Sequence, residues 1–194
     1  MHPIRCACGT VQGAVLAGTP SNRVRCYCSD CRAFGRFFGA GSNVLDSQGG
    51  TEIVQVAQGR VHITQGLDQI DAIRLSDKGM VRWYTRCCRT PIGNTMNSPG
   101  WSFMGLIHTC LAPEGLDQDF GSRVGAVNTG SAIGSPKPKQ RGALKAVAIF
   151  LRIVISARFN RRDRETQFFT RSGTPITTPR VLQAAEVEKL KRAD

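Results

Sequence analysis

In Arg25-Cys26-Tyr27-Cys28-Ser29-Asp30-Cys31-Arg32, three cysteines stand within six residues, and the rest of the chain is organised around them. Side chains two residues apart on an extended strand point to the same face, so Cys26 and Cys28 address one point in space. A turn over the next two residues brings Cys31 back towards that point. Three thiolates suit a soft divalent metal such as zinc, and three protein ligands keep a position for water or substrate. The stretch therefore predicts an open zinc site with Cys26, Cys28 and Cys31 as its catalytic residues.

Five further cysteines complete a set of eight: Cys6, Cys8, Cys87, Cys88 and Cys110. Cys6 and Cys8 repeat the two-residue spacing and share one face, whereas Cys87 and Cys88 follow several predicted strands later. One partition assigns Cys6, Cys8 and a late cysteine to a structural ion and leaves the triplet a second, open one. A single zinc, with the remaining thiols as small buried side chains, is the alternative. Cys110 has no paired neighbour and is predicted to lie in the core.

The N-terminal sequence bears on the compartment in which the protein works. Residues 1–5 contain no apolar signal region and run directly into Cys6. This favours a reducing, cytoplasmic location, in which closely spaced cysteines indicate metal binding or catalysis. A disulfide framework is the alternative for eight cysteines. Because no apolar run reaches the ~18–20 residues of a membrane span, the sequence predicts no transmembrane segment.

Short apolar segments separated by turn residues dominate the first 110 positions. Strands are expected on both sides of a tight turn at Gly9, from Val24 onwards, and over residues 51–56, 61–64, 72–75, 80–85 and 102–109. Many short strands at this spacing indicate a mainly β domain of sandwich or barrel type. The segment 33–41 is rich in glycine and phenylalanine, and we predict a loop there that lines a pocket.

The chain changes character after Phe120. A linker rich in Gly, Ser, Pro and Lys leads into a helix candidate over residues 143–160, whose apolar face is wide. This face is expected to pack on the β domain or on a second subunit, which would make a homodimer; an amphipathic helix on a membrane surface is the alternative. A final short helix is predicted over residues 181–191, opened by Pro179. We therefore predict a β domain over 1–125 and a basic, helical extension over 126–194.

The net charge of +12 is concentrated in the C-terminal extension. Between Pro136 and Arg171, 10 basic residues stand against 2 acidic ones, a balance of +8. Such a segment can attract nucleic acid, phosphate or an anionic membrane, and a solvated basic face is the plainer interpretation. A non-catalytic, zinc-stabilised binding module whose basic tail contacts nucleic acid or another anionic partner is one functional hypothesis. Aromatic residues for base stacking are sparse in the tail, so this hypothesis ranks second.

Three motifs carry a resemblance to a known family: Cys6-x-Cys8-Gly9, Cys26-x-Cys28-x-x-Cys31 and Cys88-x-Thr90-Pro91-Ile92. Over residues 4–110 the chain resembles the glutathione-dependent formaldehyde-activating (GFA) family, which includes the centromere protein V-like domains. The resemblance implies a β-tent fold, with a structural zinc on the first pair plus a late Cys-x-x-Cys. It also implies a second zinc with an open position on the triplet. The namesake activity, addition of glutathione to formaldehyde to give S-hydroxymethylglutathione, is carbon–sulfur lyase chemistry.

On this resemblance, the partners are a small-molecule thiol and an aldehyde, and the cofactor is one or two zinc ions. We predict that Arg32 or Arg36, which follow the triplet, binds a substrate carboxylate. The chain departs from the family where Thr85 stands in place of the first late cysteine and Cys87 is added beside Cys88. Adjacent residues on a strand point to opposite faces, so both late cysteines reach one ion only if the chain bends. The alternative is that another residue supplies the fourth ligand.

Overall fold

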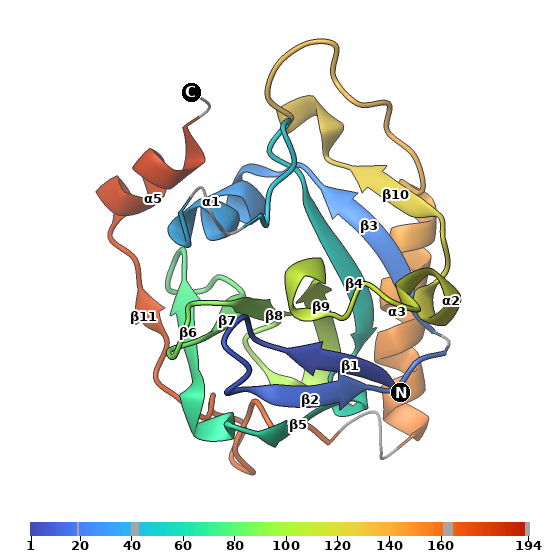
Figure 1. The fold of residues 1–194 in the computed structure, drawn as a ribbon, viewed down its shortest axis with the longest axis vertical. Coiled ribbons are helices and arrows are strands. Elements are labelled where there is room, and N and C mark those ends of the chain that lie inside the picture. Colours follow the sequence, from blue (N-terminus) through green and yellow to red (C-terminus); the bar gives the residue numbers. More distant parts are fainter. Residues whose placement is uncertain (19, 40–42, 161–164, 193–194) are drawn as a thin grey trace.

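Two β-sheets form the framework of the protein (Figure 1). The computed structural model describes residues 1–18, 20–39, 43–160 and 165–192. The smaller sheet contains β1 (His2–Arg5), β2 (Gln12–Val15) and β5 (Val61–Gln65), in the order β1-β2-β5. All its pairings are antiparallel, so it forms a short three-stranded layer beside the larger sheet.

The larger sheet runs through most of the molecule. Its strands are β3 (Asn22–Cys26), β4 (Thr51–Ala57), β6 (Ile70–Arg74), β7 (Val81–Thr85), β8 (Pro91–Thr95), β9 (Phe103–Ile107), β10 (Val124–Val127) and β11 (Arg180–Val181). The order in space is β10-β3-β4-β9-β8-β7-β6-β11. The inner pairings are antiparallel, whereas β10 and β11 join the two edges in parallel. The sheet therefore takes both edge strands from late in the chain.

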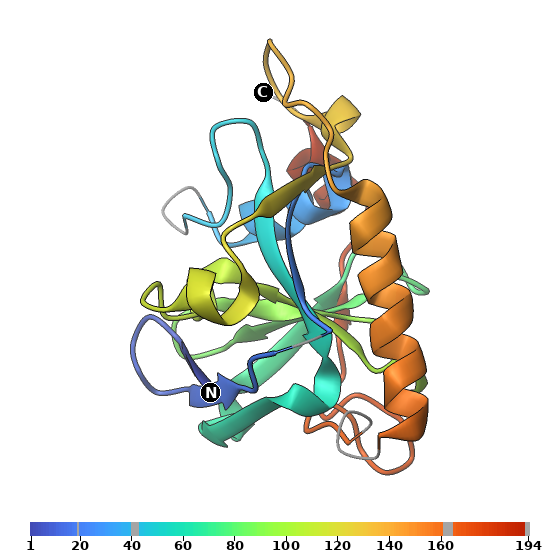
Figure 2. The same cartoon turned by 90° about the vertical axis from the view of Figure 1, so that its right-hand side faces the viewer.

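The helices are α1 (Ser29–Phe37), α2 (Leu116–Phe120), α3 (Ala143–Phe159) and α5 (Ala184–Lys191). Figure 2 shows α3 running along the side of the larger sheet that faces away from the small sheet. Helix α5 packs against α1. This mainly β architecture with a helical C-terminal part confirms the predicted fold class. None of the helices in the described residues has the length and apolar content needed to span a bilayer.

Strand alternation in β4 divides the core into two layers. Val54 and Val56 are completely buried and belong to the large core that includes Val11 of the small-sheet side and Trp83 of β7. Ile53, one residue away, belongs to a separate cluster with residues of α1, α3 and α5. Side chains on a strand point alternately to opposite faces. One central strand thus supplies the packing surface for the small sheet on one face and for the helices on the other.

The loop predicted over residues 33–41 was wrong in its first part. Residues 33–37 belong to helix α1, not to a loop, because Cys28 caps the helix and Ala33 and Phe34 are buried on its inner face. Gly35 reads as a loop residue, but a Cβ there would lie 2.5 Å from the side chain of Leu45, so close packing requires glycine.

The last helix also differs from its prediction. It begins at Ala184, because Arg180 and Val181 instead pair with Ile73 and Arg74 at the sheet edge as β11. The strands expected over residues 51–56, 61–64, 72–75, 80–85 and 102–109 are confirmed within a few residues, whereas β8, β10 and β11 were not predicted. The division at residue 125 stays a prediction, and residues on both sides of it form β10.

A buried ion-pair network holds β3 in the larger sheet. The Glu52 carboxylate of β4 accepts hydrogen bonds from Arg23 at 2.6 Å and 3.0 Å and from Arg25 at 2.9 Å. Arg23 also bonds to Asp117 and to the carbonyl of Gly121, which ties α2 and the residue after it to the sheet. Burial raises the pKa of Glu52, but the two arginines outweigh it and hold that pKa below its usual value.

Replacing Glu52 should therefore destabilise the protein in a pH-dependent way. We expect Glu52→Gln to lower the free energy of unfolding at neutral pH by about 2 kcal/mol, since charged hydrogen bonds are lost. Because the folded-state pKa of Glu52 is lowered, its contribution is present above the unfolded pKa of about 4.3 and is lost as pH falls through the folded value. Urea denaturation across pH measures this: the gap between wild type and variant should close in acid. The exposed Asp77→Asn is the control, and a gap that persists unchanged in acid would contradict the assignment.

Candidate metal centres

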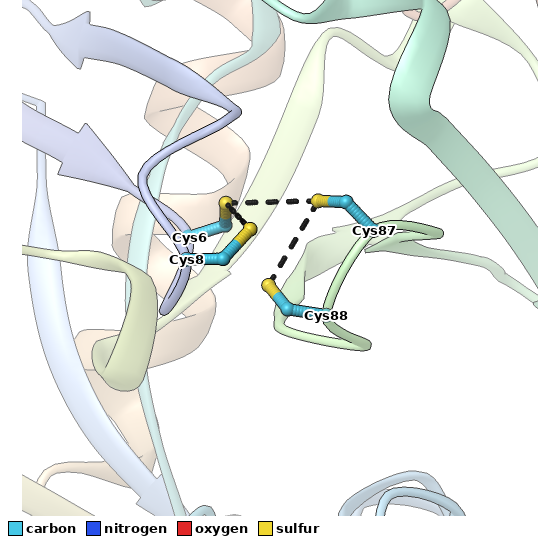
Figure 3. Close-up of side chains that lie close together, drawn as sticks. All are labelled: Cys6, Cys8, Cys87 and Cys88. Carbon is cyan, nitrogen blue, oxygen red and sulfur yellow. Dashed lines mark hydrogen bonds between the residues drawn. The ribbon is translucent and has the colours of Figure 1, made fainter.

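Four cysteine sulfurs from two distant turns converge in the first candidate site (Figure 3). Cys6 and Cys8 lie in the turn between β1 and β2, and Cys87 and Cys88 lie in the turn between β7 and β8. The sulfur of Cys6 is 3.5 Å from that of Cys8 and 3.8 Å from that of Cys87. The sulfurs of Cys87 and Cys88 are 3.9 Å apart. We call this group the four-cysteine cluster.

Two tight turns bring these sulfurs together. In the first, Gly9 adopts a left-handed φ of 79° and its N–H bonds to the carbonyl of Cys6, which folds the chain back on itself. In the second, the N–H of Arg89 bonds to the carbonyl of Thr85, and Arg89 takes a left-handed φ of 58°. The chain therefore bends after β7. Two adjacent cysteines on a straight strand would point to opposite faces, and this bend lets the sulfurs of Cys87 and Cys88 reach one ion.

Hydroxyl groups and a backbone amide surround the four sulfurs. Thr10 and Thr90 place their hydroxyl oxygens 3.2 Å from the sulfurs of Cys8 and Cys88, and the N–H of Val11 donates to Cys6 over 3.2 Å. Burial raises the pKa of Cys88, but hydrogen bonds from Thr85 and Thr90 lower it below its usual value. Such outer contacts orient ligands and stabilise thiolates. Thr85, which stands in place of a cysteine, thus supports a ligand without being one.

The spacing of the four sulfurs fits a tetrahedral metal ion. Metal–sulfur bonds of about 2.3 Å in a tetrahedral zinc site place neighbouring sulfurs about 3.8 Å apart. The sulfur–sulfur separations of 3.5 Å, 3.8 Å and 3.9 Å lie around that value, and all four sulfurs lie within 4.8 Å of one another. With four thiolates available, the cluster can satisfy such an ion without water or substrate. It has the composition of a closed structural site.

Three sulfurs converge in the second candidate site, at the junction of β3 and α1. Cys26 is the last residue of β3, Cys28 caps the N-terminus of α1 and Cys31 lies in its first turn. Their sulfurs also lie within 4.8 Å of one another. The turn predicted after Cys28 is thus the first turn of a helix. We call this group the triplet, and among the described residues no fourth cysteine, histidine or carboxylate joins it.

Hydrogen bonds and charge distribute the protons of the triplet unevenly. Hydrogen bonds from the thiols of Cys26 and Cys31 lower the pKa of Cys28, and the helix N–H of Cys31 and the charge of Arg82 add to this. The pKa values of Cys26 and Cys31 are raised, mainly through hydrogen bonding to their neighbouring thiols. In the metal-free triplet these contacts favour the thiolate form at Cys28 over that at Cys26 or Cys31. A divalent cation that binds all three sulfurs as thiolates must displace the protons that the thiols hold.

Two residues that the sequence did not single out complete the surroundings of the triplet. The side-chain amide of Asn128 donates to the sulfur of Cys26 over 3.2 Å. Arg82 is buried, and its Nε has no hydrogen-bond partner in the described part of the chain. Asn128 lies about a hundred residues beyond Cys26 and Arg82 reads as an ordinary strand residue, so no local spacing pointed to them. For the four-cysteine cluster, a signal did exist: Cys8-x-Thr10 and Cys88-x-Thr90 share one spacing.

Arg32 and Arg36 are both engaged with the C-terminal helix. The guanidinium group of Arg32 is buried and donates to the carbonyls of Ser131 at 2.7 Å and Lys191 at 3.1 Å and 3.3 Å. Arg36 donates to the carbonyls of Leu190 and Arg192. These bonds fasten α5 to α1. The role predicted for the two arginines in binding a substrate carboxylate stays a prediction.

One cysteine and two histidines outside the two cysteine groups have structural partners. Cys110 is buried, as predicted, and its thiol contacts the carbonyl of Ile92 at 3.4 Å. The ring of His2 lies 2.8 Å from both Asp119 and the carbonyl of Ala112. His108 contacts the carbonyl of Glu52 at 3.3 Å. Neither histidine belongs to a cysteine cluster, so the candidate ligands in the described residues are thiols.

A cleft of about 850 Å³ opens beside the four-cysteine cluster. Its walls include Cys88, Arg89, His108 and Phe38, the residue that follows α1. Arg89 is held over the ring of Phe37, 4.8 Å from its centre. No residue of the triplet lines this cleft. A space large enough for a small molecule is therefore present next to the cluster that has all four ligands.

Comparisons with known proteins identify a family without an assigned role. A model described as "Family of unknown function (DUF6151)" matches residues 1–149, which include both cysteine groups. No curated protein matches the chain. Among solved structures, a crystal structure of a Rhodobacter sphaeroides protein, a structural genomics target, aligns with a TM-score of 0.45 and 16% identity. That alignment covers 64% of this chain and 98% of the other.

Substitutions in the two groups should separate their metal contents. We expect the wild type to bind about two equivalents of metal and Cys28→Ser about one with the fold retained, because a closed four-ligand site remains. Cys8→Ser should instead destabilise the protein, since it leaves the turns of the four-cysteine cluster unlinked. Elemental analysis and circular dichroism measure the two effects. Cys110→Ala is the control because it removes a thiol outside both groups. About one equivalent already in the wild type would show that the triplet binds no metal, and equal metal contents in the wild type and Cys28→Ser would contradict a role for Cys28 as a ligand.

Proposed function

The chain belongs to DUF6151, a family described as of unknown function, and we propose that it is a zinc protein of GFA type acting on carbon–sulfur bonds. The proposed reaction joins a small thiol, such as glutathione, to an aldehyde, or reverses that addition. The observation that carries the proposal is the unequal number of ligands. One group has four converging cysteine sulfurs and the other has three. This matches the division into a structural and an open zinc site that the motif resemblance implies.

Zinc, when bound to three thiolates, would supply a Lewis acid that lowers the pKa of an incoming thiol. The chain's own residues prepare the site for this. Helix α1 holds Cys28 at its N-cap, where the N–H of Cys31 donates to the sulfur and favours its thiolate form. Asn128 fixes Cys26 through its amide hydrogen bond. Two of the three ligands are thus oriented before any metal arrives.

Arg82 supports the binding of an anionic sulfur at the triplet. Three thiolates and one divalent cation carry a net negative charge, and a fourth thiolate adds to it. The buried guanidinium of Arg82 compensates part of this charge, as its effect on the pKa of Cys28 indicates. Its partnerless Nε leaves one donor that no described residue uses. Arg82 is therefore a stronger candidate than Arg32 or Arg36 for contact with the reacting groups.

The proposed chemistry is balanced without an external oxidant or reductant. The thiol sulfur attacks the carbonyl carbon, a C–S bond forms, and the π electron pair of the carbonyl moves to its oxygen. That oxygen takes up the proton that the thiol gave up, which yields a hydroxyalkyl thioether. The reverse reaction cleaves the C–S bond and regenerates thiol and aldehyde. The alternative of a non-catalytic binding module with a basic tail stays a prediction.

Adduct exchange measured by NMR tests the proposed function. Purified protein is mixed with formaldehyde and, separately, glutathione, cysteine or mercaptoethanol, and the exchange between free and adduct forms is followed. We expect the protein to speed the exchange for at least one thiol, and Cys28→Ser to lose at least about 100-fold of that acceleration, as expected when a group essential to catalysis is removed. Cys110→Ala should retain the wild-type rate. An exchange rate unaffected by the wild-type protein for every thiol would refute the proposal.

A further inference from the structure

Helix α3 carries two apolar faces, and only one of them is used inside the protein. Its inner face, Ala146, Ile149, Ile153 and Ala157, is buried against the larger sheet. Its outer face consists of Leu144, Val147, Leu151, Ile155 and Phe159, whose exposed fractions are 88%, 58%, 50%, 57% and 89%. These positions recur at three- and four-residue spacing, so they form one continuous stripe. We call this stripe the outer face.

The outer face is the main concentration of exposed apolar surface in the described part of the chain. Five of the eight large, exposed apolar side chains there belong to it. A sixth, Trp101, is 46% exposed and stacks on Phe150 of the same helix at 6.4 Å. Scattered exposed apolar residues need no explanation, but a contiguous patch marks an interaction surface. Phe159 and Trp101 are of the type that favours a membrane–water boundary.

The charges around the outer face favour an anionic partner. Helix α3 contains Lys145, Arg152 and Arg158 and no acidic residue. Two copies of this helix packed together would bring like charges close, which disfavours the homodimer expected as one alternative. An anionic surface, by contrast, is attracted by the same charges. Because long basic side chains can lay their stems along apolar surface and keep their charge in water, they suit the rim of such a face.

A cationic cleft extends this rim at the start of α3. The cleft has a volume of about 580 Å³ and is lined by Arg123, Arg141 and Lys145. The side chains of these residues make no ion pair within the described residues. Lys145 neighbours Leu144, the first residue of the outer face. Unpaired cations thus adjoin the exposed apolar stripe, as an anionic lipid headgroup and its acyl chains would require.

The dimensions of α3 set how it can meet a bilayer. Its 17 residues span about 25 Å at 1.5 Å per residue, less than the roughly 30 Å of a hydrocarbon core. Its inner face is committed to the sheet. We propose that the outer face of α3 docks the protein on anionic lipid bilayers, with the helix lying in the plane of the interface and its basic rim contacting phosphate headgroups.

Vesicle binding by the full-length protein tests this proposal. The wild type should co-sediment with phosphatidylglycerol-containing vesicles at low salt and much less with pure phosphatidylcholine vesicles. Leu151→Glu should weaken binding at least about tenfold, because a buried leucine contributes roughly 1.5–3 kcal/mol. Lys145→Glu should weaken it about fivefold or more, since each basic residue near the surface contributes about 1 kcal/mol. Lys189→Glu, which changes the net charge equally on α5, should bind as the wild type does.

Tryptophan fluorescence gives an independent readout. The chain has two tryptophans, and Trp83 is completely buried, so Trp101 reports on the surroundings of α3. Its emission should shift to the blue on vesicle binding and be quenched by brominated lipids. Equal binding by Leu151→Glu and the wild type would overturn the proposal. Two further results would overturn it if the protein does not bind vesicles. One is a dimer in analytical ultracentrifugation that Leu151→Glu converts to a monomer, and the other is salt-dependent binding to DNA or RNA.

Discussion

The buried carboxylate of Glu52 holds the centre of the structure together. It binds Arg23 and Arg25 of β3 from the neighbouring strand β4, while Arg23 also contacts Asp117 of α2. A charge buried at this depth is stable only when it is paired and hydrogen-bonded. Because β3 ends at Cys26 and is followed immediately by the cap of α1, its position in the sheet also determines where the triplet lies.

The two cysteine groups use the same ligand type but are built differently. The four-cysteine cluster joins two turns that are far apart in the sequence, with threonine hydroxyls beside the sulfurs. The triplet lies within six residues and depends on a strand–helix junction, a capping N–H and the amide of Asn128. The four-cysteine cluster links two turns, so loss of its ligands would leave both turns unconnected. The triplet is carried by elements that the sheet already holds in place, so it can tolerate an incomplete set of ligands.

Local patterns in the sequence predicted the groups of cysteines better than their surroundings. The spacing of Cys26, Cys28 and Cys31 indicated convergence because it depends only on neighbouring backbone geometry. The bend that lets Cys87 and Cys88 reach one site depends on the left-handed φ of Arg89, which residue type does not favour. Helix α1 was missed because Gly35 reads as a loop residue unless the close approach of Leu45 is known. Arg82 and Asn128 are brought to the triplet by tertiary structure alone.

The attachment of α5 to α1 has a consequence for the order in which parts of the protein can fold during synthesis. Arg32 and Arg36 are synthesised long before the residues that accept their hydrogen bonds, which are Ser131 and residues 190–192. Strands β10 and β11 likewise complete the sheet edges late. A chain is synthesised from its N-terminus, and exposed strand edges and unpaired surfaces invite misassembly until they are covered. The helix that carries Cys31 therefore acquires its final neighbours only after residues 190–192 have left the ribosome.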